Sequence, residues 1–158
     1  MEGVRESAVQ VLDQFLCFVL GGETYGIPIL KVREIQVSAK ITRIPQAPEA
    51  IPGVINLRGQ IVTAIDVRAR FGLPPRTGDD LPMNVVVRTD EGVVSLLVDE
   101  IGDVLEVDEA AFERVPETLL GTIREHVRGV YKLDVGLLLL LDAERVTNLL
   151  PTRKYQAS

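Results

Sequence analysis

Short apolar runs recur along this chain, and each is closed by glycine, proline or charged residues. FLCFVL at residues 15–20 is the first, and LLLLL at 137–141 is the last. Runs of this length between turn signals are typical of buried β-strands. The pattern predicts strands at 15–20, 24–29, 54–57, 60–67, 83–88, 93–101, 104–107, 130–133 and 137–141. Val32 and Ile35 are three residues apart, which predicts a bend within 30–37.

Several of these runs are paired across very short turns. Arg58-Gly59 separates the arms VINL and QIVTAIDV, and the segment TDEG, with Asp90 and Gly92, separates MNVVVR from VVSLLVDEI. Two-residue turns of this kind place glycine at a positive φ, which costs it no steric strain. The sequence therefore predicts antiparallel hairpins at both places, and a further one around residues 134–136.

Helix signals are few and short. An aspartate precedes each of two predicted helices: Asp66 before a segment that ends at Gly72, and Asp142 before residues 143–150. Aspartate is a favoured N-cap because its side chain accepts a hydrogen bond from a free backbone N–H. Elsewhere we expect a short helix or a loose arm at 4–13, one helical turn at 108–113, irregular structure at 117–127 and a polar loop at 76–82.

The chain contains an internal repeat. GVINLRGQIVTAID at 53–66 aligns without a gap with GVYKLDVGLLLLLD at 129–142, an offset of 76 residues. The glycine, most of the apolar positions and the final aspartate match, but Arg58 of the first copy is replaced by Asp134 in the second. Many short strands with turn signals are typical of small barrels or sandwiches, so two copies predict two small barrels.

Composition supports a β-rich, non-nucleic-acid-binding protein. Hydrophobic residues make up 46% and aromatic residues 4%, so a core would consist of the branched aliphatic side chains that favour strands. Lys and Arg number 17 against 23 Asp and Glu, a net charge of −6. Without a basic cluster, binding to nucleic acid or to anionic membranes is not expected. No signal peptide is apparent, and LLLLL is too short to cross a bilayer.

The sequence offers little for catalysis. His126 is the single histidine, and we expect it on the surface or in a loop; Cys17 lies in an apolar run, and we expect it to be buried. No Cys/His cluster has metal-ligand spacing, so no metal or cofactor is expected. Asp66, Asp99 and Asp142 each close an apolar run. They could converge as acid/base groups of a small carboxylate-dependent enzyme, but capping explains two of them locally.

Several separated motifs, in the right order, resemble the CheW family of bacterial chemotaxis adaptors. The most characteristic is ITRIPQAPEAIPGVINLRG, residues 41–59; FVLGGETYGIPILKVREI, LLVDEIGDVLEV and LLLLLDAERVTNLL also resemble it. The resemblance covers about residues 15–150. It implies an all-β fold of two intertwined, five-stranded, Src-homology-3-like barrels with short helices. Within one domain over 1–158, the subdomains would span roughly 15–75 and 83–150, with strands exchanged between them.

The resemblance also implies function and site. Family members are non-enzymatic cytoplasmic scaffolds that couple the cytoplasmic tips of methyl-accepting chemoreceptors to the regulatory domain of the histidine kinase CheA, in receptor arrays at the membrane. Weak or no self-association is expected outside arrays. The matching partner-binding positions are Ile29, Val32, Glu34, Ile35, Asn56, Arg58, Gly59 and Ile101. They would line a groove between the barrels that receives a receptor helix.

Simpler interpretations stay open for these residues. Ile29, Val32 and Ile35 also suit an ordinary core, and Glu34 and Arg58 also suit a solvated surface. For the whole chain, a paralogue serving gliding, pili or development, which binds receptor without kinase, is an alternative within the family. The repeat favours binding for Arg58, because the second copy keeps the hairpin but not the charge.

Overall fold

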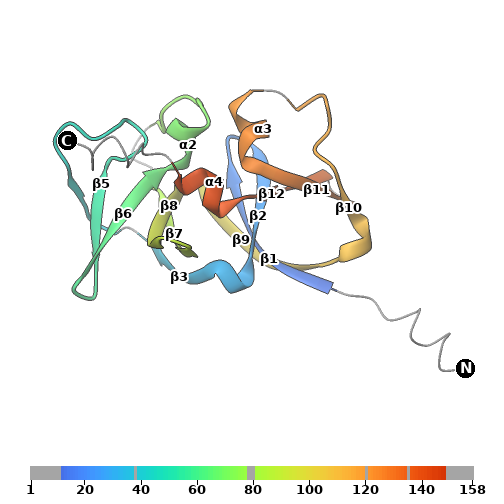
Figure 1. The fold of residues 1–158 in the computed structure, drawn as a ribbon, viewed down its shortest axis with the longest axis horizontal. Helices are drawn as coiled ribbons and strands as arrows, with labels where there is room; N and C mark the ends of the chain where they lie inside the picture. Colours follow the sequence, from blue (N-terminus) through green and yellow to red (C-terminus); the bar gives the residue numbers. More distant parts are fainter. Residues whose placement is uncertain (1–11, 38, 78–80, 120, 135, 149–158) are drawn as a thin grey trace, which may run out of the picture.

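The fold consists of two sheets, each of six strands, that lie side by side (Figure 1). The structure is a computed structural model, and it describes residues 12–37, 39–77, 81–119, 121–134 and 136–148. The first sheet has the order β3 (Val32–Val37), β7 (Met83–Thr89), β8 (Gly92–Val98), β6 (Gln60–Asp66), β5 (Gly53–Leu57), β4 (Ile41–Arg43). The second has the order β10 (Phe112–Glu113), β11 (Val127–Leu133), β12 (Gly136–Leu141), β2 (Glu23–Pro28), β1 (Leu12–Leu20), β9 (Glu100–Asp108). The prediction of an all-β fold with intertwined strands is confirmed.

Short helical segments connect these strands. They are the 3₁₀ turns η1 (Ile29–Lys31) and η2 (Glu109–Ala111), and the α-helices α2 (Val67–Arg70), α3 (Thr122–His126) and α4 (Ala143–Thr147). None of the helices in the described ranges is long and apolar enough to span a membrane.

The two sheets do not coincide with the two halves of the sequence. The β1–β2 hairpin joins the strands β9–β12 of the second half, and the β7–β8 hairpin joins the strands β3–β6 of the first half. Each exchanged hairpin is attached by a parallel pairing, β2 with β12 and β8 with β6. The connection between β6 and β7 joins two strands of the same sheet, so it is not one of the places where the chain crosses between the sheets.

The repeat corresponds to a hairpin followed by a capped helix. β5–β6–α2 and β11–β12–α4 have the same order, and Asp66 and Asp142 accept hydrogen bonds from the backbone N–H of Arg68 (3.0 Å) and Arg145 (3.1 Å). The repeated glycines, Gly53 and Gly129, allow a close approach of the neighbouring edge strand. A Cβ there would collide with the Thr42 carbonyl in the first copy and with the Phe112 ring in the second.

The core has three parts. The largest cluster packs between the two sheets and draws on strands from both, together with the helices α2 and α4. A smaller cluster lies against the other face of each sheet. Central strands are thus buried on both faces, which explains why Val85, Val86 and Val87 are all buried and why the sequence shows continuous apolar runs.

Several local predictions were wrong. Residues 93–101 do not form one strand, because the chain passes from the first sheet to the second at Asp99. Residues 122–126, expected to be irregular, form α3; five residues are too few to show a period, and tertiary packing stabilises the helix. Each sheet has six strands where five were implied, and each includes a short edge strand, β4 of three residues or β10 of two.

Other expectations are modified or lie outside the description. The bend expected within 30–37 occurs at its start, where η1 precedes β3. Residues 108–113 form a 3₁₀ turn and a two-residue strand. The last helix ends at Thr147, so the expected extension over 149–150, like most of the 4–13 segment, lies outside the described residues.

Candidate functional site

The turn between β5 and β6 presents Arg58 at its tip. Arg58 and Gly59 have φ values of 52° and 87°, as a two-residue type I′ hairpin turn requires. Asn56 Oδ1 accepts a hydrogen bond from the Gly59 N–H at 2.7 Å, which closes the turn. Asn56 and Gly59 therefore shape the turn, while the Arg58 side chain is 68% exposed.

Arg58 is paired with Glu34 of β3. One guanidinium nitrogen, Nη1, donates to Glu34 Oε2 at 2.9 Å, and Nη2 contacts Oε1. In the sheet order β3 is separated from β5 and β6 by other strands, so this pair shows that the first sheet curls until its two sides meet. The hydrogen bonds from Arg58 lower the pKa of Glu34. The two charges form one bidentate site instead of two independently solvated groups.

The predicted apolar positions fall into two environments. Ile29, Val32 and Ile101 are half-buried and pack against the central core cluster. Ile35 is 42% exposed on β3. Val32 pairs with Val87, and Ile101 pairs with Phe18, so each lies near the start of an edge strand of its sheet. The structure thus joins Glu34 to Arg58 and places Ile29, Val32 and Ile101 at the border of the shared core.

Some exposed apolar side chains were missed by the sequence reasoning. Leu30 of η1 is 86% exposed although it lies within the apolar run IPILKV. It borders a cavity of about 730 Å³ at one side of the second sheet, with Leu12 and Phe112 also on its lining. At this cavity the Tyr131 ring lies 5.2 Å from Phe15 and 5.4 Å from Phe112. No sequence pattern predicts this cluster, because its members come from four separate segments.

Asp99 is the most strongly perturbed carboxylate in the described chain, and its role is structural. It accepts hydrogen bonds from Arg68 Nε (2.8 Å) and Nη2 (2.9 Å), from Arg76 Nη2 (2.9 Å) and from the Gly21 N–H (3.0 Å). Burial alone would raise its pKa, but these hydrogen bonds outweigh burial and lower the pKa to about 2. We call these four residues the Asp99 cluster.

The other residues considered for chemistry are also structural. Asp66 and Asp142 cap α2 and α4, as predicted. His126 is buried, contrary to the prediction, with Nδ1 2.6 Å from the Thr122 carbonyl oxygen and its ring against Phe71; burial lowers its pKa. Cys17 is buried, as predicted, and burial raises its pKa. No group of three potential metal ligands occurs among the residues that the structure describes.

The fold defines a β-rich domain built from two sheets that exchange hairpins. The CheW-like domain family matches residues 14–150. A chemotaxis protein CheW of Klebsiella aerogenes is 38% identical over 85% of this chain and 81% of its own length, and that of Bacillus subtilis is 31% identical over 85% and 86%. The chain belongs to the CheW family of chemotaxis scaffold proteins.

A solved structure supports this assignment. The scaffolding protein TtCheW of Thermoanaerobacter tengcongensis superimposes with a TM-score of 0.80 at 29% identity, covering 88% of this chain and 94% of that one. A shorter match is to protein FrzA of Myxococcus xanthus, 32% identical over 72 residues, which cover 41% of this chain and 44% of FrzA.

Proposed function

We propose that this protein is a cytoplasmic, non-enzymatic adaptor that couples the cytoplasmic tips of chemoreceptors to a CheA-type histidine kinase. Membership of the CheW family supports the scaffold role. Within the molecule, the proposal is supported mainly by the pair of Arg58 and Glu34. Arg58 is held at the tip of a two-residue turn, and the two strands of that hairpin are packed into the core. In arrays the adaptor would lie at the inner face of the membrane without inserting into it.

The receptor-binding surface we propose comprises the Arg58 turn (residues 56–59), Glu34 and Ile35 on β3, and the half-buried Ile29, Val32 and Ile101. A receptor helix would place apolar side chains against the isoleucines and valine, in the helix-in-groove mode. Arg58 and Glu34 would set its register through polar contacts, since charges at an interface rim contribute more to specificity and association rate than to affinity.

Binding assays with the two proposed partners test this function. We expect the purified protein to bind the regulatory domain of the CheA from its own organism, and to bind a receptor tip fragment at a separate surface. A ternary complex of adaptor, kinase domain and receptor fragment is the expected product when all three are mixed. If the protein binds neither partner by calorimetry at micromolar concentrations, the coupling function is wrong.

The match to protein FrzA supports one second candidate, a paralogue within the family, which we take to be an adaptor serving gliding, pili or development. Such a paralogue would bind receptor without kinase. The same assay separates the two candidates: binding of receptor fragment alone favours the paralogue, and binding of both partners favours the coupling adaptor.

A further inference from the structure

The two helices of the repeat hold the two places where the chain crosses between the sheets. Arg68 in α2 and Glu144 in α4 are equivalent, at the same offset of 76 residues as the rest of the repeat. Arg68 binds Asp99, which lies between β8 and β9. Glu144 binds Lys31, which lies between β2 and β3. The acidic and basic partners are therefore reversed between the two crossings.

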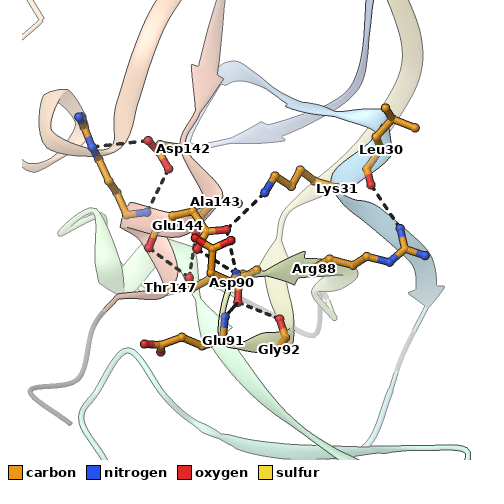
Figure 2. Close-up of polar contacts among 12 residues, drawn as sticks. Leu30, Lys31, Arg88, Asp90, Glu91, Gly92, Asp142, Ala143, Glu144 and Thr147 are labelled. Atoms are coloured by element: carbon orange, nitrogen blue, oxygen red, sulfur yellow. Dashed lines mark hydrogen bonds and ion pairs between the residues drawn. The ribbon is translucent and has the colours of Figure 1, made fainter. Parts of the chain in front are cut away.

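A hairpin turn takes part in each arrangement. The Gly21 N–H, in the turn between β1 and β2, donates to Asp99 Oδ2 at 3.0 Å. The Asp90 N–H, in the equivalent turn between β7 and β8, donates to both Glu144 oxygens at 3.2 Å (Figure 2). The Asp99 carboxylate therefore links the β8–β9 crossing to α2 and to the β1–β2 hairpin. In the same way, the Glu144 carboxylate links α4 to the β2–β3 crossing and to the β7–β8 hairpin. We call Lys31, Asp90 and Glu144 the Glu144 cluster.

The two clusters differ in strength. In the Asp99 cluster, the arginine side chains are 16–19% exposed, and contacts of 2.8–2.9 Å surround the carboxylate. In the Glu144 cluster, Lys31 Nζ lies 3.4 Å from Glu144 Oε2, and the two side chains are 41% and 37% exposed. An exposed ion pair of this kind adds little to global stability, because water and salt screen it.

The Glu144 cluster contacts η1, which contains Ile29 and directly precedes Val32, two residues of the proposed binding surface. Arg88 of β7 donates from Nη1 to the Leu30 carbonyl oxygen at 3.2 Å, so η1 is held from β7 on one side and from α4 on the other (Figure 2). No side chain of η1 is fully buried, and only Ile29 packs against the central core, so the polar contacts from α4 and β7 add to the forces that hold this segment in place.

We propose that Glu144 is a positioning residue that latches η1 in place. It sets where Ile29 and Val32 lie for a partner, whereas the Asp99 cluster secures the fold. Loss of the Glu144 contacts would free η1 and the β7–β8 turn locally without unfolding either sheet, because neither sheet's ladder depends on them. The consequence for binding rests on the proposed function, since it concerns the receptor-binding surface.

Amide hydrogen exchange followed by mass spectrometry tests the latch directly. Glu144→Ala should raise exchange at residues 29–33 and 90–92 by about tenfold, the effect of losing hydrogen bonds to a charged group. Glu144→Gln keeps an acceptor for the Asp90 N–H but loses the charge, so it should loosen 29–33 more than 90–92. Glu113→Ala is the matched control, because it removes another exposed Lys–Glu pair, with Lys132 at 3.5 Å on β11.

The outcomes separate the latch from the proposed function. Exchange at 29–33 that is the same in Glu144→Ala as in the wild type would overturn the latch, whatever the partners do. Faster exchange there, with the melting temperature within a few degrees and unchanged exchange around Asp99, would support it. Binding of a receptor tip fragment should then fall about threefold to tenfold in Glu144→Ala and not in Glu113→Ala. If the wild-type protein does not bind the fragment, the proposed function fails, but the exchange result still decides the latch.

Discussion

The two copies of the repeat share the same order of hairpin and helix but differ in the charged side chains that they carry. Both copies keep the glycine where an edge strand passes closely, the apolar positions of the hairpin, and the aspartate that caps the following helix. Arg58 at one turn corresponds to the exposed Asp134 at the other, and Arg68 corresponds to Glu144. Positions that build the fold are retained in both copies, and positions that face solvent or another segment diverge. The comparison therefore separates folding roles from partner-specific ones inside one chain.

The largest difference in stability is expected at the repeated glycines. In Gly53→Ala the new Cβ would collide with the backbone carbonyl of Thr42, which cannot move without shifting β4. In Gly129→Ala the new Cβ would meet the Phe112 ring, which is 41% exposed and can turn aside, and the Glu113 carbonyl oxygen at 2.7 Å, a less severe backbone collision than the one with the Thr42 carbonyl. We expect a loss in the free energy of unfolding of about 3 kcal/mol for Gly53→Ala and about 1–2 kcal/mol for Gly129→Ala. Urea denaturation of both variants measures this, and equal losses would contradict the proposed difference.

The next effect concerns the two clusters at the crossings. Asp99 has a pKa of about 2 in the folded protein against an ordinary value of 3.8, so its charged form stabilises the fold by about 2 kcal/mol at neutral pH. Asp99→Asn should lose about that amount, whereas Glu144→Gln should lose less than about 0.5 kcal/mol. Chemical denaturation of the two variants beside the wild type tests the ranking.

The pH dependence gives the Asp99 prediction a second test. Because the folded pKa is depressed, the stabilisation is fully present above about pH 4 and is lost as the pH falls toward 2. The difference between wild type and Asp99→Asn should therefore shrink steadily when unfolding is measured from pH 5 down to pH 2. A difference that stays constant over this range would show that the carboxylate charge is not what stabilises the crossing.

The capping aspartates should behave alike in the two copies. Asp66→Ala and Asp142→Ala each remove one hydrogen bond to a helix N-terminus and should each cost about 1 kcal/mol. Asp→Asn at the same positions keeps an acceptor and serves as the control, with a smaller loss. Thermal melts of the four variants measure this. If the loss of stability differed clearly between the Asp66 and Asp142 variants, one aspartate would have a role beyond capping.

The smallest stability effect and the largest functional one are expected at the hairpin tips. Arg58→Asp gives the first copy the residue of the second and should change the free energy of unfolding by no more than about 0.5 kcal/mol, because the site is exposed. It should nevertheless weaken activation of the kinase by receptor in a reconstituted assay. Asp134→Arg, the reciprocal change, should leave that activation intact. Full kinase activation by Arg58→Asp would remove Arg58 from the binding surface.

Much of the local structure was predictable because it depends on neighbouring residues. The hairpin around Arg58-Gly59, the capping by Asp66 and Asp142 and the burial of Cys17 all follow from short-range pattern and residue chemistry. Short-range pattern predicted only part of the candidate site. Its residues were indicated by family resemblance, but nothing in the sequence indicated that Glu34 is bound to Arg58, since the pair forms only when the sheet curls.

Long-range features were not predictable from pattern. The apolar run 93–101 looks continuous, yet Asp99 interrupts it where Arg68, Arg76 and the Gly21 N–H converge from distant segments. His126 looks like a surface residue in a polar segment, but α3 buries its ring against Phe71. In both cases the deciding contact lies many residues away along the chain.

By itself, the sequence determined that this protein is β-rich, repeated, and composed of hairpins that end in capped helices, because apolar runs, turn residues and caps act over a few neighbouring positions. It also determined the family. The tertiary structure alone decided which hairpin joins which sheet, where the chain crosses between them, and which charges meet there. A strand's apolar pattern specifies that it will be buried but does not specify its neighbour; parallel pairings such as β2 with β12 and β8 with β6 depend on the packing of the shared core.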